Sequence, residues 1–374
     1  MAANRKIICV AGTRPEVVKM APVYHALRAE PDAVDVQFVS TAQHRQMLDQ
    51  MLSVFGIGPD HDFDLMRDGQ TLSDVTCAVL YALDDYLAVS RPDLVRAQGD
   101  TTTVMATAMA CFHRRIPFGH VEAGLRTHDL HRPFPEEFNR RVAGVVADYH
   151  FAPTGRSAEN MAREQVDRSR IYVTGNTVID AMRYIFANTR SPRSLVPEGA
   201  PYVFMTCHRR EIFGEKIREV FHAVREIAER YPELYIWYPV HPNPEVQKSA
   251  EEILAEHPRI LLCAPLDYVC CLYAMQGATL ILSDSGGVQE EAPYLGVPLL
   301  VLRDVTERPE GVDAGNSLLV GPHRDAMLEA VERLLTDSSV HEGMSQTASP
   351  YGDGRAAQRI CDILTGREWE PWDG

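Results

Sequence analysis

The sequence predicts an α/β protein with two domains, each built around a parallel sheet. Short β-branched runs alternate with amphipathic helical segments along almost the whole chain, which is typical of parallel sheets covered by helices on both faces. At 374 residues the chain is longer than the roughly 250–300 residues at which a single hydrophobic core stops growing. Residues 188–201 are rich in Ser, Pro and Arg and lack periodicity, which indicates a connection between the domains.

In the first part of the chain, each strand-like run leads into a helical segment. The segment 16–30 carries an apolar stripe at helical spacing that includes Val17, Met20 and Tyr24, so we expect a helix there. The expected strands are 6–10, 36–41, 93–98 and 170–174, and the expected helices are 16–30, 46–55, 102–114 and one that ends at 186.

The same alternation begins again after the connection. The expected strands are 202–206, 235–240, 259–263, 280–283, 299–302 and 317–320, and the expected helices are 215–231, 244–257 and 324–335. A last helix at 355–364 follows the Pro- and Gly-containing break 349–354. We therefore expect domains at 1–174 and 175–354, with residues 355–374 packed back on the first domain.

Composition argues against several classes of function. The net charge of −15 and the lack of a basic stripe disfavour nucleic-acid binding, and no apolar run reaches the roughly 18–20 residues of a membrane helix. The eight cysteines form no C-x-x-C pair and no secretory signal opens the chain, so we expect a cytoplasmic protein. Walker and H-E-x-x-H patterns are absent and no dinucleotide motif follows a strand, so we expect neither cofactor nor metal.

Polar clusters follow the strands expected in the first domain. The segment G-T-R-P-E at 12–16 opens a helix, where Arg14 and Lys19 could hold a phosphate; an ordinary turn with solvated charges is the alternative. Three acids follow later strands: Asp100, Glu122 and Glu136. Carboxylates gathered at one rim of a sheet can divide acid and base roles, although each could instead cap a helix.

The second domain offers cationic groups and a glycine turn. His208 and His241 each follow an expected strand. A single histidine at a strand end usually has a structural role, but two that face the same cleft indicate a functional one. The segment S-D-S-G-G-V-Q-E-E at 283–291 leads from a strand into a helix, so its backbone N–H groups and helix dipole could hold a diphosphate. Glu291 could then bind ribose hydroxyls and Arg308 a phosphate.

Taken together and in this order, these motifs resemble those of the non-hydrolysing UDP-N-acetylglucosamine 2-epimerases along nearly the whole chain. The resemblance implies two Rossmann-like domains arranged as in GT-B glycosyltransferases, with the active site in the cleft between them, commonly in a homodimer. It implies an isomerase that interconverts UDP-N-acetylglucosamine and UDP-N-acetylmannosamine by eliminating and re-adding UDP through 2-acetamidoglucal. Such enzymes supply precursors of bacterial surface polysaccharides.

The resemblance also implies roles for particular residues. The catalytic set is Asp100, Glu122, Glu136 and His208, with acid and base unassigned. The substrate-binding set is Arg14, Lys19, Tyr268, Ser285, Gly286, Gly287, Glu291 and Arg308. A second UDP-N-acetylglucosamine would bind as an allosteric activator at Gln43, His44, Gln46, Gln70, Arg210 and His241.

The sequence departs from the family pattern at Gly69, Ile212 and the strand segment V-R-A at 95–97, where an apolar run is usual. Two other enzymes stay open as alternatives: a hydrolysing relative that releases UDP and N-acetylmannosamine, and a glycosyltransferase of the same fold. The retained Gln43 and Gln46 argue against the first. A non-catalytic UDP-sugar-binding regulator would require loss of the carboxylates, and all of them are present.

Overall fold

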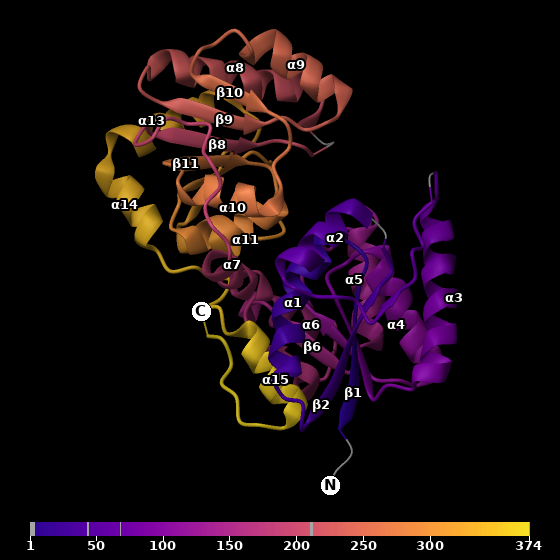
Figure 1. Cartoon of the computed structure of the whole chain (residues 1–374). Helices are drawn as coiled ribbons and strands as arrows, with labels where there is room; N and C mark the ends of the chain where they lie inside the picture. The colour runs from indigo at the N-terminus through magenta and orange to yellow at the C-terminus, as the bar shows by residue number, and fades with distance from the viewer. Residues whose placement is uncertain (1–3, 43–44, 68, 210–211, 374) are drawn as a thin grey trace. The chain divides into compact units, whose positions relative to one another are not determined.

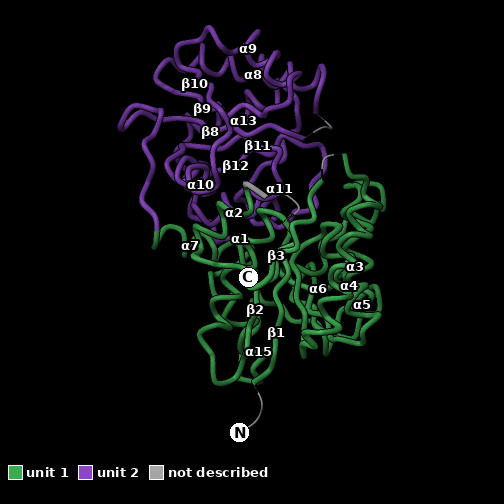
Figure 2. Tube along the Cα trace, turned by 45° about the vertical axis from the view of Figure 1, so that its right-hand side comes forward, with its two compact units in different colours: residues 1–188, 351–374 green, residues 189–350 purple. Residues whose placement is uncertain are grey.

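A computed structural model describes residues 4–42, 45–67, 69–209 and 212–373, which divide into two compact units (Figure 2). Unit 1 comprises Met1–Asn188 and Tyr351–Gly374, and unit 2 comprises Thr189–Pro350. The unit boundary after Asn188 differs from the predicted domain limit at 174. The difference is helix α7 (Thr177–Asn188), which belongs to unit 1 because it packs against α1 (Arg14–Arg28).

Unit 1 is built on a sheet of seven strands within the described residues, in the order β3-β2-β1-β4-β5-β6-β7. All neighbouring strands in it pair in parallel. The strands are β1 (Arg5–Ala11), β2 (Val34–Ser40), β3 (His61–Asp62), β4 (Leu94–Gln98), β5 (Phe118–Val121), β6 (Tyr149–Ala152) and β7 (Ile171–Val173).

Two layers of helices cover this sheet. Helices α1, α7 and α15 pack against one another in one layer, and α3, α4 and α5 pack side by side in the other (Figure 1). The remaining helices of unit 1 are α2 (Arg45–Val54), α3 (Leu72–Ser90), α4 (Thr102–Arg114), α5 (Glu136–Val146), α6 (Gly155–Arg163) and α15 (Ala356–Thr365), with a short 3₁₀ helix at Arg168–Arg170. The last helix, α15, thus returns from the far end of the chain to unit 1.

The charged residue in the V-R-A strand segment is accommodated inside the core of unit 1. Arg96 is fully buried and donates from Nη2 to Sγ of Cys9, 2.9 Å away, on the neighbouring strand. Gly119 lies beside it, and a Cβ there would approach Cγ of Arg96 to 3.0 Å. The lack of a side chain at Gly119 therefore gives the long Arg96 side chain room to lie along the sheet.

Unit 2 has a parallel sheet of six strands among its described residues, in the order β10-β9-β8-β11-β12-β13. The strands are β8 (Tyr202–Thr206), β9 (Tyr235–Pro239), β10 (Ile260–Cys263), β11 (Leu280–Ser283), β12 (Leu299–Val301) and β13 (Ser317–Leu319). The helices are α8 (Glu215–Arg230), α9 (Pro244–Leu254), α10 (Tyr268–Gln276), α11 (Gly286–Leu295), α12 (Glu310–Ala314), α13 (Arg324–Thr336) and α14 (Ser338–Gln346).

The two sheets confirm the predicted fold class of two Rossmann-like parallel-sheet domains. In each sheet the strand order reverses between two central strands, β1 and β4 in unit 1 and β8 and β11 in unit 2. Ligands of such folds bind beyond the carboxyl ends of the strands at this reversal. The loops that follow these four strands are therefore where a site is expected.

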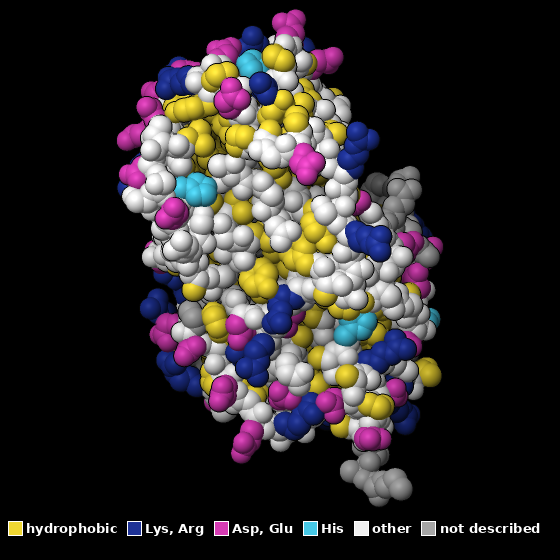
Figure 3. Space-filling model, turned by 60° about the vertical axis from the view of Figure 1, so that its left-hand side comes forward, with side chains coloured by type: hydrophobic (Ala, Val, Ile, Leu, Met, Phe, Trp, Pro, Cys, Tyr) yellow, Lys and Arg dark blue, Asp and Glu magenta, His cyan; other side chains and the backbone are white. Residues whose placement is uncertain are grey.

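Surface charge and helix length bear on whether the chain could bind nucleic acid or cross a membrane. Acidic and basic side chains are interspersed over the face shown in Figure 3. Among the described residues, no helix combines the length and apolar character needed to cross a bilayer.

Candidate active site

The loop after β1 is held by a buried glutamate. Glu16 lies in the first turn of α1 and accepts N–H bonds from Gly12 at 2.5 Å and Thr13 at 3.2 Å. Its other oxygen accepts the hydroxyl of Thr101, which belongs to the loop after β4. Burial raises the pKa of Glu16 to about 7, despite these hydrogen bonds. Glu16 thus joins the two loops at the strand reversal of unit 1.

Gly12 is required by the close approach of this loop to its neighbours. A Cβ at Gly12 would lie 2.2 Å from Oγ1 of Thr41 and 2.8 Å from Oγ1 of Thr103. Both distances are shorter than real contacts, so the loop can take this path only without a side chain. The chain then enters α1 at Arg14, which is half-buried.

Lys19 and Glu122 form a buried ion pair. Nζ of Lys19, on α1, contacts Oε2 of Glu122, the first residue after β5. Both residues are less than a tenth exposed. The backbone of Glu122 adopts a positive φ of 62°, a conformation that is uncommon outside glycine and clusters at functional sites. Lys19, which the sequence predicts to bind the nucleotide, therefore contacts a residue of the predicted catalytic set.

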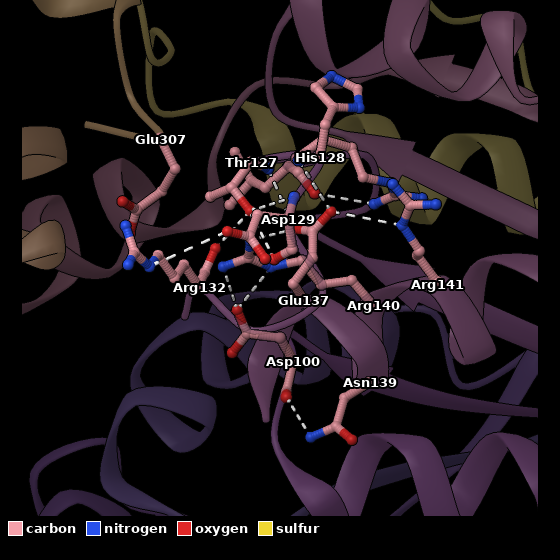
Figure 4. Close-up of polar contacts among 12 residues, drawn as sticks. Asp100, Thr127, His128, Asp129, Arg132, Glu137, Asn139, Arg140, Arg141 and Glu307 are labelled. Atoms are coloured by element: carbon pink, nitrogen blue, oxygen red, sulfur yellow. Dashed lines mark hydrogen bonds and ion pairs between the residues drawn. The ribbon is translucent and has the colours of Figure 1, made fainter. Parts of the chain in front are cut away.

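Asp100 is held by an arginine that the sequence analysis did not select. Arg140, on α5, donates to Oδ2 of Asp100 from Nε at 2.9 Å and from Nη2 at 2.7 Å (Figure 4). Asn139 donates to the carbonyl oxygen of Asp100 at 2.9 Å. The Asp100 side chain keeps a quarter of its surface exposed, whereas that of Arg140 is almost fully buried. Asp100 can therefore contact solvent or a ligand, while the buried guanidinium of Arg140 compensates its charge.

Arg140 is in turn anchored by Glu137, which is fully buried. Glu137 accepts from Nη1 of Arg140 at 3.1 Å and from the backbone N–H groups of Thr127 and His128 at 3.1 and 3.2 Å (Figure 4). It thereby joins α5 to the loop after β5. Glu136, the predicted catalytic residue, precedes Glu137 at the first position of α5.

The loop after β5 is fixed from two other directions. His120 is buried, and its Nε2 lies 2.7 Å from the carbonyl oxygen of Gly99 in the loop after β4. Burial lowers the pKa of His120 to about 4, so the ring is neutral near pH 7. Gly124 has a φ of 94°, and a Cβ there would meet the carbonyl oxygen of Ser157 at 2.2 Å. These contacts position the backbone on both sides of Glu122.

In unit 2 the glycine turn after β11 forms the amino terminus of α11. Ser285 is the N-cap residue, and Gly286 and Gly287 are the first two residues of the helix. A Cβ on Gly286 would lie 2.8 Å from Nη1 of Arg308, so the glycine lets the guanidinium lie across the helix start. The helix N–H groups and the Arg308 guanidinium thus lie together at this turn, where the sequence predicts a diphosphate site.

Arg308 is fixed by buried carboxylates. Its Nε donates to Glu290 at 2.5 Å and its Nη1 donates to Glu307 at 2.7 Å. Glu307 also accepts from Nη1 of Arg303 at 2.8 Å. Burial acts to raise the pKa of Glu307, but Arg308 and Arg303 hold it well below its usual range. This network therefore fixes the orientation of the Arg308 guanidinium.

Two further predicted binding residues lie in contact. The hydroxyl of Tyr268, at the start of α10, donates to Oε1 of Glu291 on α11 at 2.7 Å. Glu291 is buried, so the pair lies within unit 2 beside the glycine turn.

The histidines of unit 2 stack. The rings of His208 and His241 are 6.1 Å apart between centroids with an interplanar angle of 22°. Of the predicted activator residues, Gln70 accepts the backbone N–H of Arg67 at 2.8 Å. Gln43, His44 and Arg210 lie outside the described residues, as does the side chain of Gln46.

Sequence reasoning missed the residues that hold the predicted ones in place: Glu16, Glu137, Arg140, Asp284, Glu290 and Glu307. A signal existed for Arg140, because Glu137 and Arg140 are three residues apart on a helix and so share a face. For Asp284, the signal was a lone acid between a strand and a glycine turn. The partner of Glu16 at Thr101 is 85 residues away, and nothing in the local sequence indicates it.

Comparison with known proteins decides the family. A family model described as UDP-N-acetylglucosamine 2-epimerase matches residues 25–365. The UDP-N-acetylglucosamine 2-epimerase of Yersinia pestis is 48% identical over 369 residues, covering 96% of this chain and 98% of its own length. That of Escherichia coli K12 is 47% identical with the same coverage. The chain belongs to the UDP-N-acetylglucosamine 2-epimerase family.

Solved structures support the same family assignment. The UDP-N-acetylglucosamine 2-epimerase of Neisseria meningitidis, bound to UDP-N-acetylglucosamine, is 40% identical with a TM-score of 0.91, covering 97% of this chain and 100% of its own. The glycosyltransferase of kitacinnamycin has a TM-score of 0.65 at 14% identity, which shows a common fold alone. This neighbour bears out the predicted likeness of the epimerase fold to GT-B glycosyltransferases.

Proposed function

We propose that this member of the epimerase family catalyses reversible epimerisation of UDP-N-acetylglucosamine to UDP-N-acetylmannosamine at C2. The observation that carries the proposal is the pairing of two carboxylates with cations, Asp100 with Arg140 and Glu122 with Lys19, after neighbouring strands of one sheet. Carboxylates held in a fixed position can give and take protons as general acids and bases. The named activity of the relatives supports the substrate.

The proposed chemistry follows from the substrate. The C2 proton of the sugar has no adjacent carbonyl, so a base cannot remove it directly. Cleavage of the bond between C1 and the diphosphate oxygen gives C1 cationic character, and loss of the C2 proton then yields 2-acetamidoglucal and UDP. Re-addition of UDP to C1, with a proton delivered to the opposite face of C2, gives the epimer. Asp100, Glu122, Glu136 and His208 share these proton transfers as a group.

The diphosphate and the nucleoside are assigned to different groups. The departing diphosphate is negatively charged, and the α11 amino terminus, Arg308 and Arg14 supply positive charge for it. Glu291 accepts ribose hydroxyls, and Tyr268, which donates to Glu291, lies beside the uracil. Because Lys19 pairs with Glu122, we assign to Lys19 the additional role of holding that carboxylate in position.

The direct test is proton exchange with solvent. The purified chain is incubated with UDP-N-acetylglucosamine in deuterated water and followed by NMR. We expect deuterium at C2 of a UDP-N-acetylmannosamine product. Stoichiometric accumulation of free UDP and N-acetylmannosamine would instead indicate the hydrolysing reaction, and a requirement for an acceptor would indicate a glycosyltransferase.

A second UDP-N-acetylglucosamine is proposed as an activator, bound by Gln43, His44, Gln46, Gln70, Arg210 and His241. The stacking of His241 on His208 supports this, because a residue proposed for the activator lies beside a residue proposed for catalysis. We expect UDP-N-acetylmannosamine alone to react slowly and a trace of UDP-N-acetylglucosamine to accelerate it. Equal initial rates with and without that trace would remove the activator.

A homodimer is proposed through the helical layer formed by α3, α4 and α5. These helices expose Tyr81, Phe112 and Val145, at 71%, 66% and 87% of their surfaces. Exposed apolar side chains on neighbouring helices are typical of association surfaces. Light scattering should give the mass of two chains, and Phe112→Glu should shift it toward one. A single-chain mass for the unaltered protein would contradict this.

A further inference from the structure

Asp284 is a buried acid that the proposed chemistry leaves without a role. It follows β11 directly and precedes the N-cap residue Ser285 of the glycine turn. Its side chain is fully buried. One carboxylate oxygen, Oδ2, accepts the backbone N–H groups of His208 at 2.8 Å and Arg209 at 2.7 Å. Asp284 therefore fixes the loop after β8 from the neighbouring strand.

The other oxygen of the same carboxylate faces the imidazole. Oδ1 of Asp284 lies 3.3 Å from Nδ1 of His208. No hydrogen bond of ordinary geometry to this oxygen occurs in the described part of the chain. Leaving a buried acceptor without a donor is unfavourable, so the nearest N–H donor is strongly favoured. Donation from Nδ1 of His208 meets this requirement with a small rotation of the ring.

The thiol of Cys207 is the other group near this carboxylate. Burial raises the pKa of Cys207 well above its usual range, and the Asp284 carboxylate raises it further, so the thiol stays protonated. A thiol is only a weak donor. It therefore does not replace the imidazole N–H as the partner of Oδ1.

We propose that Asp284 is a positioning residue that holds His208 in the tautomer protonated at Nδ1, which leaves the lone pair of Nε2 for proton transfer. This rests on the proposed function, in which His208 exchanges protons with substrate. When Nε2 takes a proton, the ring becomes an imidazolium and the nearby Asp284 carboxylate stabilises its charge. When Nε2 returns the proton, the ring is again neutral and protonated at Nδ1.

A purely structural role would consist of the two backbone contacts alone. Asp284→Asn separates the roles, because the amide oxygen can still accept both backbone N–H groups. The amide NH₂ then takes the place of Oδ1 and donates toward Nδ1 of His208. The structural contacts persist while the donor and acceptor at the imidazole are exchanged, which favours the tautomer protonated at Nε2.

The experiment measures the His208 tautomer in the full chain with ¹⁵N-labelled histidine, its signals assigned by their loss in His208→Gln. We expect protonated Nδ1 in the unaltered protein and protonated Nε2 in Asp284→Asn. We also expect kcat to fall at least about tenfold, with the Kd for UDP unchanged within about twofold. Cys207→Ala, which removes the weak thiol donor without adding a new one, is the matched control and should keep the original tautomer.

Two spectral results would overturn the proposal: an Nε2-protonated His208 in the unaltered protein, or a His208 that stays protonated at Nδ1 in Asp284→Asn. The first can be read even if the variant does not fold. The spectra do not depend on turnover, so a chain without epimerase activity would defeat the proposed function while the tautomer still tests the pairing of Asp284 with His208. Unchanged kcat in a folded, active variant would also count against it.

Discussion

At the carboxyl end of the unit 1 sheet, the loops after β4 and β5 carry the acids Asp100 and Glu122, each neutralised by a basic side chain from a helix. At the corresponding end of unit 2, the loops after β8 and β11 carry an imidazole and a glycine turn, and the acids lie beneath them. The strand order that surrounds both sites is the same.

The difference shows how one topology serves two kinds of chemistry. In the Asp100–Arg140 pair of unit 1, the carboxylate is the exposed group and the cation is the buried supporting group. In unit 2 the outermost groups are Arg308 and helix N–H groups, and the supporting groups, Glu290 and Glu307, are carboxylates. Under the proposed function, unit 1 exchanges protons and unit 2 holds negative charge.

The strongest test of this contrast removes charge from the acids of unit 1. Asp100→Asn and Glu122→Gln should each lower kcat by on the order of hundredfold, because a general acid or base contributes about that much. The Kd for UDP, measured by calorimetry, should stay nearly constant. Asp129→Asn, at a half-exposed acid in the same unit, is the control and should keep full activity. Turnover at the original rate in both variants would remove the catalytic assignment.

A second prediction concerns Glu16, whose pKa is raised by burial from 4.5 to about 7. The folded chain then binds more protons than the unfolded chain between these values, so Glu16 lowers stability as pH rises. Relative to Glu16→Gln, the original protein should lose about 2 kcal/mol of unfolding free energy between about pH 5 and pH 7.

Urea denaturation at several pH values measures this difference. Asp32→Asn, at an exposed acid in unit 1, is the control and should show no comparable pH dependence. A constant difference between Glu16→Gln and the original protein over the whole range would show that Glu16 does not titrate there.

The smallest effect is expected at the glycine turn of unit 2. Gly286→Ala places a Cβ 2.8 Å from Nη1 of Arg308 and must displace the guanidinium, so the Kd for UDP should rise about tenfold, as for one charged hydrogen bond. Gly343→Ala, at an exposed glycine of α14 with open space around it, should leave the Kd unchanged. Equal affinities in the two variants would contradict the role of Arg308 at the proposed diphosphate site.

Much of the fold was predictable because its signals are local. Short β-branched runs followed by amphipathic helices indicated both parallel sheets, and the polar clusters after strands indicated the loops that carry the site. Helix α3 was missed although it has 19 residues. Its buried Val79, Leu83 and Leu87 form a helical stripe, but exposed Tyr81 and Val89 on other faces weaken that periodicity.

The candidate site was predictable only in part, for a different reason. Asp100 and Arg308 could be found because each follows a strand, whereas their partners Arg140 and Glu290 lie inside helices. Contacts such as that between Asp284 and His208 join residues 76 positions apart and depend on which strands are neighbours. Local periodicity cannot supply that information, because it is fixed only when the sheet assembles.

The return of α15 to unit 1 also bears on how the chain is made. Ile360 and Leu364 are buried in unit 1, yet they follow every residue of unit 2 along the chain. Every residue of unit 2 has been synthesised before the helix that covers α1 is available. During synthesis, part of the apolar surface of unit 1 therefore stays uncovered until the whole of unit 2 has been translated.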